Sequence, residues 1–401
     1  MSLRARPLGL LAGRVVAIAA LIGFGVATPI AAQAAPPSSH VHVCPGPTRG
    51  YASCHALRND ARGASATAPT SGYGPTEIQA AYGLTAAASS NGSSQTIAIV
   101  DAYDAPNAEA DLATYRSQYK LPACASATGC FRKVNQSGGT TPPRADGGWA
   151  QEISLDLDMA SAVCPNCKIL LVEASSASMA NLGTAVDTAA RLGATVISNS
   201  YGGSSSSADS SYDHYYDHSN VAITVSSGDS GYGVEYPAAS PFVTAVGGTS
   251  LKKASNSRGW TESAWSGAGS GCSSSDAQPS WQAGVSELTA RCAKRAVADV
   301  SAVADPNTGV AVYDSYRYQG RSGWMVFGGT SVASPIIASV YALAGNAASV
   351  TYGSYPYSHR SSLNDVSGGS TGSCGGTALC TALGGWDGPT GLGTPNGTGA
   401  F

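Results

Sequence analysis

Charged side chains are scarce in this sequence of 401 residues: Asp, Glu, Lys and Arg together make up 12%, about half of their usual share in globular proteins. The formal net charge is −3 at pH 7. A chain without excess positive charge is not expected to bind nucleic acid. Glycine and tyrosine are plentiful instead, with 49 and 19 copies, so we expect a surface rich in Ser, Thr, Gly, Asn and Tyr.

Long hydrophobic runs are also missing, apart from one near the N-terminus. Three arginines precede the apolar run Val15–Val26, and the small residues Ala32–Ala34 follow it. The run is too short to cross a bilayer comfortably, and small residues at this place are typical of a cleavage site. We therefore predict that residues 1–34 are a signal peptide and that the protein is secreted, extracellular and without stable membrane association. A retained membrane anchor is the alternative.

The ten cysteines fit an exported protein, because they follow one another in five close pairs. The natural proposal is five local disulfides in an oxidising compartment. The motif Cys164-Pro-Asn-Cys167 could instead be a redox or metal pair, but no second CxxC and no nearby histidine completes a zinc site. The expected pairs are Cys44 with Cys54, Cys124 with Cys130, Cys164 with Cys167, Cys272 with Cys292, and Cys374 with Cys380.

Two segments with different patterns divide the rest of the chain. Residues 35–72 are rich in Pro, Ser, Ala and Gly and predict a short, loosely structured leader or pro-segment. After it, apolar strand patterns alternate with helical ones. This alternation predicts an α/β domain over residues 73–401, with a parallel sheet, helices on both faces and the active site at the carboxyl ends of the strands. The expected strands are 95–101, 168–174, 194–202, 220–231 and 242–248, and the expected helices are 107–119, 150–163 and 179–193.

The segment Phe327–Pro335, FGGTSVASP, predicts a tight turn that places Ser331 at the start of a helix. Proline is tolerated in the first helical turn, so Pro335 supports this position. Free backbone N–H groups and the helix dipole can stabilise negative charge there. An ordinary glycine-rich turn before a capped helix is the alternative.

A nucleophilic serine needs a base, and histidine is scarce. None of the six histidines lies in a subtilisin-like setting; three fall in the leader, and His214 and His218 fall in a polar, tyrosine-rich loop. Glu152 and Asp156 are four residues apart on a predicted helix, so they share a face, whereas Asp158 points elsewhere. Two close carboxyl groups can share a proton, which would let the glutamate act as base. A solvated acidic face is the alternative.

Two further aspartates follow predicted strands. Asp101 ends the strand IAIVD, and Asp229 lies in SSGDSG. A protonated Asp229 could donate a hydrogen bond to an oxyanion, although an Asx-turn is the plainer interpretation. GDSG also resembles the nucleophile turn of chymotrypsin-like proteases, but that fold is all-β and does not fit the alternation of strands and helices.

Six segments of the chain resemble the sedolisin family of serine-carboxyl peptidases, which share a subtilisin-like fold. GYGPTEIQAAYGL resembles the start of the family's catalytic domain, EISLDL its Glu-x-x-x-Asp helix, SSGDSG its oxyanion turn, and FGGTSVASP its nucleophile segment. DVSAVADPNTGVAVY and GWDGPTGLGTPNG resemble its late segments. Members of the family usually carry a long folded propeptide before the catalytic domain. Here the short leader would replace that propeptide, or the domain would fold unaided.

The resemblance implies a role for each site residue. Ser331 is expected to be the nucleophile, Glu152 the general base, Asp156 its support and Asp229 the oxyanion donor. Asp101 falls where some members hold an extra acid behind the glutamate, and Tyr201 where some have tryptophan. The expected activity is endopeptidase cleavage of proteins or peptides in acid by a monomer.

The resemblance also implies one structural calcium ion near the C-terminus. The matching segments are LNDVSGG and ALGGWDG. Ligation by oxygen alone suits a hard cation such as Ca²⁺. The expected ligands are the side chains of Asp365 and Asp387 and the carbonyls of Val366, Leu383 and Gly385.

Two other function classes remain open. One is a secreted binding protein on an inactive peptidase scaffold. The other is a serine hydrolase of the α/β-hydrolase type, which requires a G-x-S-x-G motif that Ser331 lacks.

Overall fold

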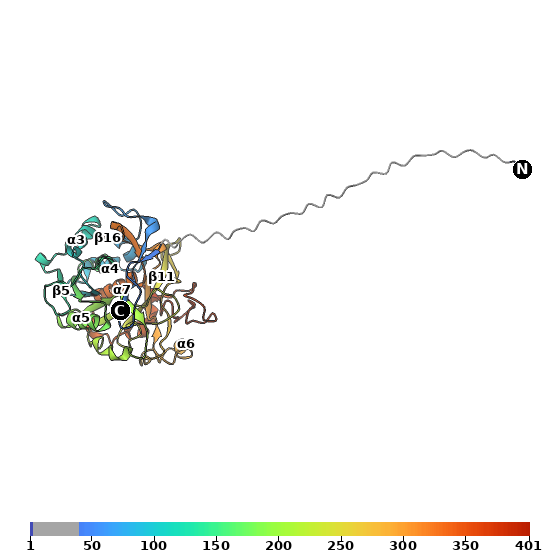
Figure 1. Cartoon of the computed structure of the whole chain (residues 1–401). Helices are drawn as coiled ribbons and strands as arrows, with labels where there is room; N and C mark the ends of the chain where they lie inside the picture. Colours follow the sequence, from blue (N-terminus) through green and yellow to red (C-terminus); the bar gives the residue numbers. More distant parts are fainter. Residues whose placement is uncertain (3–39) are drawn as a thin grey trace. The chain divides into compact units, whose positions relative to one another are not determined.

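The computed structural model describes residues 1–2 and 40–401. Residues 40–401 form one compact unit (Figure 1). The predicted signal peptide lies outside the described residues, save for its first two. Among the residues that are described, none of the helices combines the length and apolar character needed to cross a membrane.

A central eight-stranded sheet organises this unit. Its strands follow the order β12-β11-β9-β7-β4-β6-β5, with β15 also paired to β11, and only β12 runs antiparallel to its neighbour. The strands are β4 (Thr96–Ala102), β5 (Phe131–Asn135), β6 (Lys168–Ala174), β7 (Val196–Asn199), β9 (Ala222–Ser226), β11 (Thr244–Lys253), β12 (Trp260–Ala264) and β15 (Val300–Val303). The inner strands read as continuous buried runs, as expected where helices cover both faces of a parallel sheet.

Helices cover this sheet as the sequence predicts. α4 (Gly147–Val163) and α7 (Thr330–Ala344) pack against each other and on the sheet, while α5 (Met179–Arg191) packs on β4 and β6. α3 (Ala108–Gln118) packs on α4. The shorter helices are α1 (Pro75–Ala81), α2 (Thr85–Ser90), α6 (Ser286–Thr289) and α8 (Tyr355–Ser358). The predicted fold, a subtilisin-like α/β domain with a parallel sheet between helices, is confirmed.

One predicted strand is broken in two. The segment 194–202 was expected to be continuous, but β7 ends at Asn199 and β8 (Tyr201–Ser204) joins a separate small sheet between β2 (Ser53–Cys54) and β10 (Glu235–Tyr236). The break falls at Ser200, which is fully buried. The carbonyl group of Ser200 is thereby free to accept hydrogen bonds from outside the central sheet.

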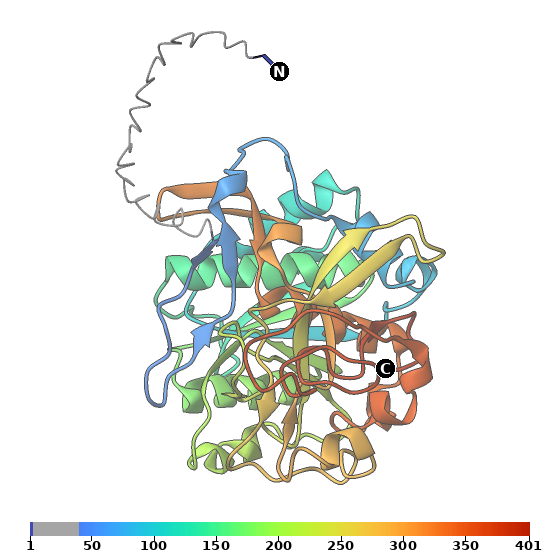
Figure 2. The same ribbon diagram turned by 90° about the vertical axis from the view of Figure 1, so that its right-hand side faces the viewer.

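The predicted leader is not loosely structured where the structure describes it. β1 (His40–His42) pairs with β3 (Leu57–Asn59), and β3 pairs with β17 (Arg321–Gly328) of the hairpin that β17 forms with β16 (Val310–Tyr318). Figure 2 shows these N-terminal strands in blue beside the orange hairpin. Residues 40–72 therefore belong to the same unit as the rest of the domain, because partners far along the chain satisfy their backbone groups. Two-residue strands complete the picture: β13 (Gly271–Cys272) with β14 (Ala296–Val297), and β18 (Leu363–Asn364) with β19 (Thr394–Pro395).

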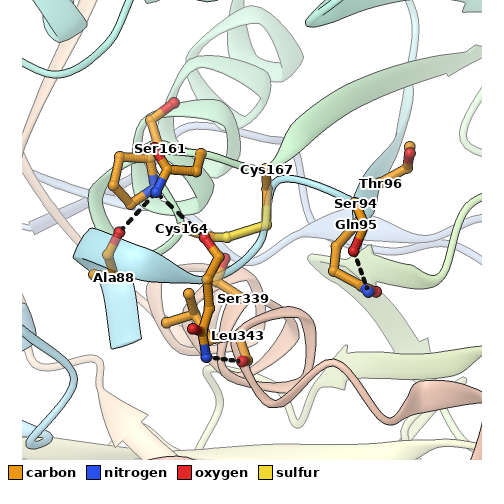
Figure 3. The surroundings of a disulfide bond; sticks show 12 residues. Ala88, Ser94, Gln95, Thr96, Ser161, Cys164, Cys167, Ser339 and Leu343 are labelled. Atoms are coloured by element: carbon orange, nitrogen blue, oxygen red, sulfur yellow. Dashed lines mark hydrogen bonds between the residues drawn. A yellow bond between two sulfur atoms is a disulfide. The ribbon is translucent and has the colours of Figure 1, made fainter. Parts of the chain in front are cut away.

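All five predicted disulfides are formed, and none of the ten cysteines is free. The Cys164–Cys167 bond closes the C-terminal end of α4, between the segment Ser94–Thr96 and the residues Ser339 and Leu343 of α7 (Figure 3). Gly92 passes close to this bond with φ +91°, and a Cβ there would overlap the Cys164 sulfur. The Cys164–Cys167 pair is therefore a structural disulfide.

Candidate active site

Ser331 lies at the start of a helix, as predicted. It is the second residue of α7, after Gly329 at φ +96°, and it is fully buried. Its hydroxyl donates to the carbonyl of Ser200 at 3.3 Å. Pro335, however, lies one turn beyond the expected first turn, inside α7. Because proline has no N–H, it leaves the Ser331 carbonyl without its usual helical donor. The Ser200 hydroxyl lies 3.5 Å from that carbonyl but bonds more closely to Asp156 Oδ1.

Glu152 and Asp156 lie on one face of α4, and both are fully buried. The helix begins earlier than predicted because the Asp146 side chain caps it, accepting from Gly148 N and Trp149 N. Asp158 points away, as expected, and accepts from Tyr313 N at 2.9 Å. The sequence therefore placed the two carboxyl groups correctly on a shared helix face, and that face is buried rather than solvated.

Burial dominates the electrostatics of this pair. It raises the pKa of Glu152 well above its ordinary value, and the Asp156 carboxylate raises that pKa further. Ser331 is close enough to oppose this rise, although no hydrogen bond of standard geometry joins it to the free Glu152 oxygen. Burial likewise raises the pKa of Asp156, whose Oδ1 accepts from the Ser200 hydroxyl at 2.8 Å. The pair is thus disposed to hold a proton between its two carboxyl groups.

Asp101 extends this acidic cluster from the central sheet. It is fully buried in β4, opposite Glu173 of β6, and neither of its carboxyl oxygens has a hydrogen-bond partner in the described chain. Burial raises the pKa of Asp101 well above its ordinary value, and the charges of Asp156, Glu152 and Glu173 raise it further. Its place beside the pair matches the sequence prediction.

Tyr201 lies nearby but does not bond to the carboxyl groups. Its hydroxyl donates to Asn199 Oδ1 at 2.9 Å, and its ring lies 6.4 Å from the Trp149 ring, centroid to centroid. Trp149 is itself buried, in the first turn of α4. Tyr201 thus forms part of the apolar wall behind the cluster.

Asp229 lies three residues after β9 and contacts Thr330, the residue before Ser331. Its Oδ1 accepts from both the N–H and the hydroxyl of Thr330 at 2.8 Å, and its Oδ2 has no partner among the described residues. Burial raises its pKa to about 7, with His55 and Thr330 opposing the rise. In acid the carboxyl group is therefore protonated, and the unpaired Oδ2 is available to donate a hydrogen bond.

Three residues that sequence reasoning missed also lie here. His55 comes from the predicted leader, and its ring contacts Ser226 at the end of β9 and Glu235 of β10. No sequence signal marks them, since 171 and 180 positions separate the contacting partners. Only the folded chain brings them to the cleft.

The residues expected to bind calcium lie together in a separate loop region. Gly385 N donates to Asp365 Oδ2 at 3.1 Å, and Leu383 N donates to Asp387 Oδ2 at 3.0 Å. The carbonyl oxygens of Val366, Leu383 and Gly385 accept no hydrogen bond within residues 40–401. In the part that the structure describes, no group of three or more His, Cys, Asp or Glu side chains is arranged to hold a metal ion. Two carboxylates and free carbonyls fit an oxygen-only set.

Comparisons with known proteins agree with this geometry. The model of the subtilase family matches residues 138–356, more than half of the chain. Kumamolisin from Bacillus sp. (strain MN-32) is 31% identical over 375 residues, which cover 84% of this chain and 64% of that protein. Sedolisin from Pseudomonas sp. (strain 101) is 34% identical over 203 residues, which cover 43% of this chain and 32% of that protein.

This chain belongs to the sedolisin members of the subtilase family. A solved structure of Pseudomonas sedolisin, described as a serine-carboxyl proteinase in complex with two molecules of pseudo-iodotyrostatin, matches with a TM-score of 0.67 and 25% identity. The match covers 82% of this chain and 96% of that one. The chain spans less than two thirds of the length of either curated relative in the sedolisin group.

Proposed function

We propose that this chain is a secreted serine-carboxyl endopeptidase that hydrolyses proteins or peptides in acid. The observation that carries the proposal is the meeting of four groups at one point: Ser331, the Glu152–Asp156 pair and the unpaired Oδ2 of Asp229. They come from α7, α4 and the turn after β9. Membership of the sedolisin group supports the same assignment.

In the proposed reaction, Ser331 Oγ attacks the substrate carbonyl carbon while Glu152 takes the hydroxyl proton. The proton bound between Glu152 and Asp156 can move as Glu152 changes charge, so Asp156 supports the base. The protonated Asp229 donates from Oδ2 to the developing oxyanion, together with backbone N–H groups at the start of α7. Glu152 then delivers its proton to the leaving amine, and water repeats the sequence on the acyl-enzyme.

Asp101 has a positioning role in this proposal. Burial and its neighbours Asp156, Glu152 and Glu173 raise the pKa of its own carboxyl group, so Asp101 keeps its proton in acid and adds no negative charge beside the pair. Tyr201 contributes to the wall that excludes water from the cluster. Neither residue reaches the reacting atoms.

We also propose that Asp365 and Asp387, with the carbonyls of Val366, Leu383 and Gly385, hold one structural calcium ion. The donor set supports this, because it joins two carboxylates with carbonyl oxygens that accept no hydrogen bond from any described residue. Secretion is proposed from the N-terminal pattern and from the five disulfides, which suit an oxidising compartment. A monomer with protein or peptide substrates as its partners completes the proposal.

Digestion of casein between pH 3 and pH 8 tests the function. Wild type should digest casein in acid, and Ser331→Ala should not. Ser339→Ala is a matched control, because that buried hydroxyl bonds only to the Pro335 carbonyl of its own helix. Absence of digestion by wild type at every pH would favour an inactive binding protein, whereas full activity of Ser331→Ala would remove this serine as the nucleophile.

A further inference from the structure

Buried carboxyl groups fasten the hairpin of β16 and β17 to two helices. β16 packs on α3 and α4, and the three elements lie next to one another in Figure 1. The pairing of β16 with β17 is regular from Val310 to Asp314 and is then interrupted until Tyr318. In and beside this interruption, backbone N–H groups of β16 donate to aspartate side chains rather than to a neighbouring strand.

The accepting aspartates come from α3, α4 and β16 itself. They are Asp111 (accepting from Ser315 N at 2.9 Å), Asp158 (from Tyr313 N at 2.9 Å) and Asp314 (from Tyr316 N at 3.0 Å). All three residues are buried, with exposures between 1% and 3%. Within residues 40–401, none of them takes part in a salt bridge. No cation therefore neutralises these side chains by direct contact.

Asp314 has one oxygen that the backbone does not satisfy. Its Oδ2 is buried and has no hydrogen-bond partner among the described residues. The Asp111 carboxyl group is close enough to act on Asp314 both through its charge and as a hydrogen-bond partner. Two ionised carboxylates so close would repel each other, whereas a proton between them lets one donate to the other. The Asp111–Asp314 pair is therefore satisfied only while it holds a proton.

The surroundings of the pair favour this proton. Burial, followed by Asp111, raises the pKa of Asp314 to about 7, against the effects of Tyr316 N and the Gln151 side chain. Burial also raises the pKa of Asp111, although Ser315 and Asp314 oppose the rise.

Three more charged groups face the pair from the elements packed around it. Asp158 of α4 adds negative charge, and burial, Asp111 and Asp314 raise its own pKa. Arg116 of α3 acts on Asp158, but its guanidinium bonds to Ser161 and to two backbone carbonyls. Arg58 of β3 donates to Gln151, so its charge reaches the pair only through that amide. The two cations therefore have other partners.

Two parts of the candidate site depend on where the hairpin lies. β17 ends at Gly328, three residues before Ser331. β17 also pairs with β3 of the N-terminal segment. β3 begins directly after Ala56, whose N–H donates to Glu152 Oε2 at 2.9 Å. A displaced hairpin would therefore disturb both the serine and the N-terminal segment that covers the cleft.

We propose that the Asp111–Asp314 pair is a proton-dependent latch, which holds the β16–β17 hairpin on α3 and α4 in acid and releases it as the pH rises to neutrality. This inference goes beyond the proposed function, because its test measures the hairpin itself. The docked pair binds its proton more tightly than carboxyl groups in water do, so docking is strongest below the pKa of a free carboxyl group, about 4. Docking then weakens as the pH rises toward the pKa of the docked pair.

Hydrogen exchange measured by mass spectrometry tests the latch, on protein that carries Ser331→Ala so that it cannot digest itself. The protection factor compares each peptide with an unstructured chain at the same pH, which removes the intrinsic pH dependence of exchange. We expect protection of residues 310–328 to fall by about 10- to 100-fold between pH 5 and pH 7, since opening gains up to about tenfold per pH unit between the two pKa values. Residues 57–59 should follow the hairpin, whereas α5 should keep its protection.

Two substitutions should remove or reduce this decline. Asp314→Asn can still accept from Tyr316 N and donate to Asp111, but it does not titrate, so the hairpin should stay protected at pH 7. Asp111→Asn removes the other carboxyl group of the pair and should also reduce the decline. Asp187→Asn is the matched control, because Asp187 is exposed and pairs with His218. A decline that survives both substitutions, or an equal decline in α5, would overturn the latch.

Trp324 gives a second measurement that remains decisive if Asp314→Asn fails to fold. Its ring centroid lies 5.8 Å from those of Tyr115 and Tyr119 of α3, and 5.2 Å from that of Tyr313 of β16. Its emission is obtained as the difference between the Ser331→Ala proteins with and without Trp324→Phe. We expect this emission to move to longer wavelength between pH 5 and pH 8, as the hairpin leaves α3 and water reaches the ring. The same emission at both pH values would refute the proposal.

Discussion

The Asp229→Asn variant gives the sharpest test of how the site handles charge. The pKa of Asp229 is raised to about 7, chiefly by burial. The protonated fraction then falls from about 99% at pH 5 to about 9% at pH 8, since each pH unit above the pKa reduces it about tenfold. If only the protonated form donates to the oxyanion, kcat/KM of wild type should fall about tenfold over this range.

The side-chain amide of the Asp229→Asn variant can make the same hydrogen bonds as the protonated carboxyl group, but it does not titrate. Its oxygen can accept from Thr330 as Asp229 Oδ1 does, and its NH₂ group takes the place of the unpaired Oδ2. We expect Asp229→Asn to keep measurable activity at pH 5 and to lose part of the decline toward pH 8. Near-complete inactivity would mean that Asp229 also exchanges a proton during the reaction. Asp229→Ala should lose about 10²- to 10³-fold in kcat, as for other oxyanion donors.

Profiles of kcat/KM from pH 3 to pH 9, measured on one peptide with wild type, Asp229→Asn and Asp229→Ala, distinguish these outcomes. Circular dichroism at each pH separates loss of chemistry from unfolding. A wild-type optimum at pH 8 combined with full activity of Asp229→Ala would refute the reasoning, because an ionised carboxylate would repel the oxyanion that it is meant to stabilise.

Three further predictions concern the base, the metal and the acidic cluster. Glu152→Gln should reduce kcat nearly as much as Ser331→Ala, because an amide cannot accept the serine proton. The Tm of this variant should stay close to that of wild type. A kcat near that of wild type would exclude Glu152 as the base. EDTA should lower Tm, because an ion that binds only the folded state stabilises that state. An unchanged melting curve, with no calcium found by elemental analysis, would contradict the proposed calcium site. Asp101→Asn should raise Tm at pH 7 more than at pH 4. The pKa of Asp101 is raised in the folded state, so the folded protein loses stability as the pH rises above the pKa that this carboxyl group has in the unfolded chain. An equal change in Tm at both pH values would contradict this prediction.

Local patterns were enough to predict the fold and half of the site. The alternation of buried strands and helices follows from short-range periodicity, and the spacing of Glu152 and Asp156 is a property of one helix. The turn before Ser331 is also local. Pro335 was expected within the first turn but lies deeper in α7, where it leaves the Ser331 carbonyl without a helical donor.

The rest of the site depends on contacts between distant parts of the chain. The composition of residues 35–72 predicts weak local structure, and that reasoning fails because β8 and β17 supply backbone partners for β2 and β3. The pocket around His55 joins the N-terminal segment to β9 and β10. No pattern within any one of these segments indicates the other two.

The position of the Cys44–Cys54 disulfide determines which breaks in the N-terminal segment can open the cleft. Residues 45–51 are exposed, and exposed loop tips are the usual targets of other proteases. A nick there leaves both halves joined through the two sulfur atoms, so β2 keeps its place against β8. Both cysteines precede His55, so a cut after β2 separates this strand covalently from the domain, whereas a cut within residues 45–51 does not. The disulfide therefore makes the covering of the cleft insensitive to damage in the exposed loop that it closes.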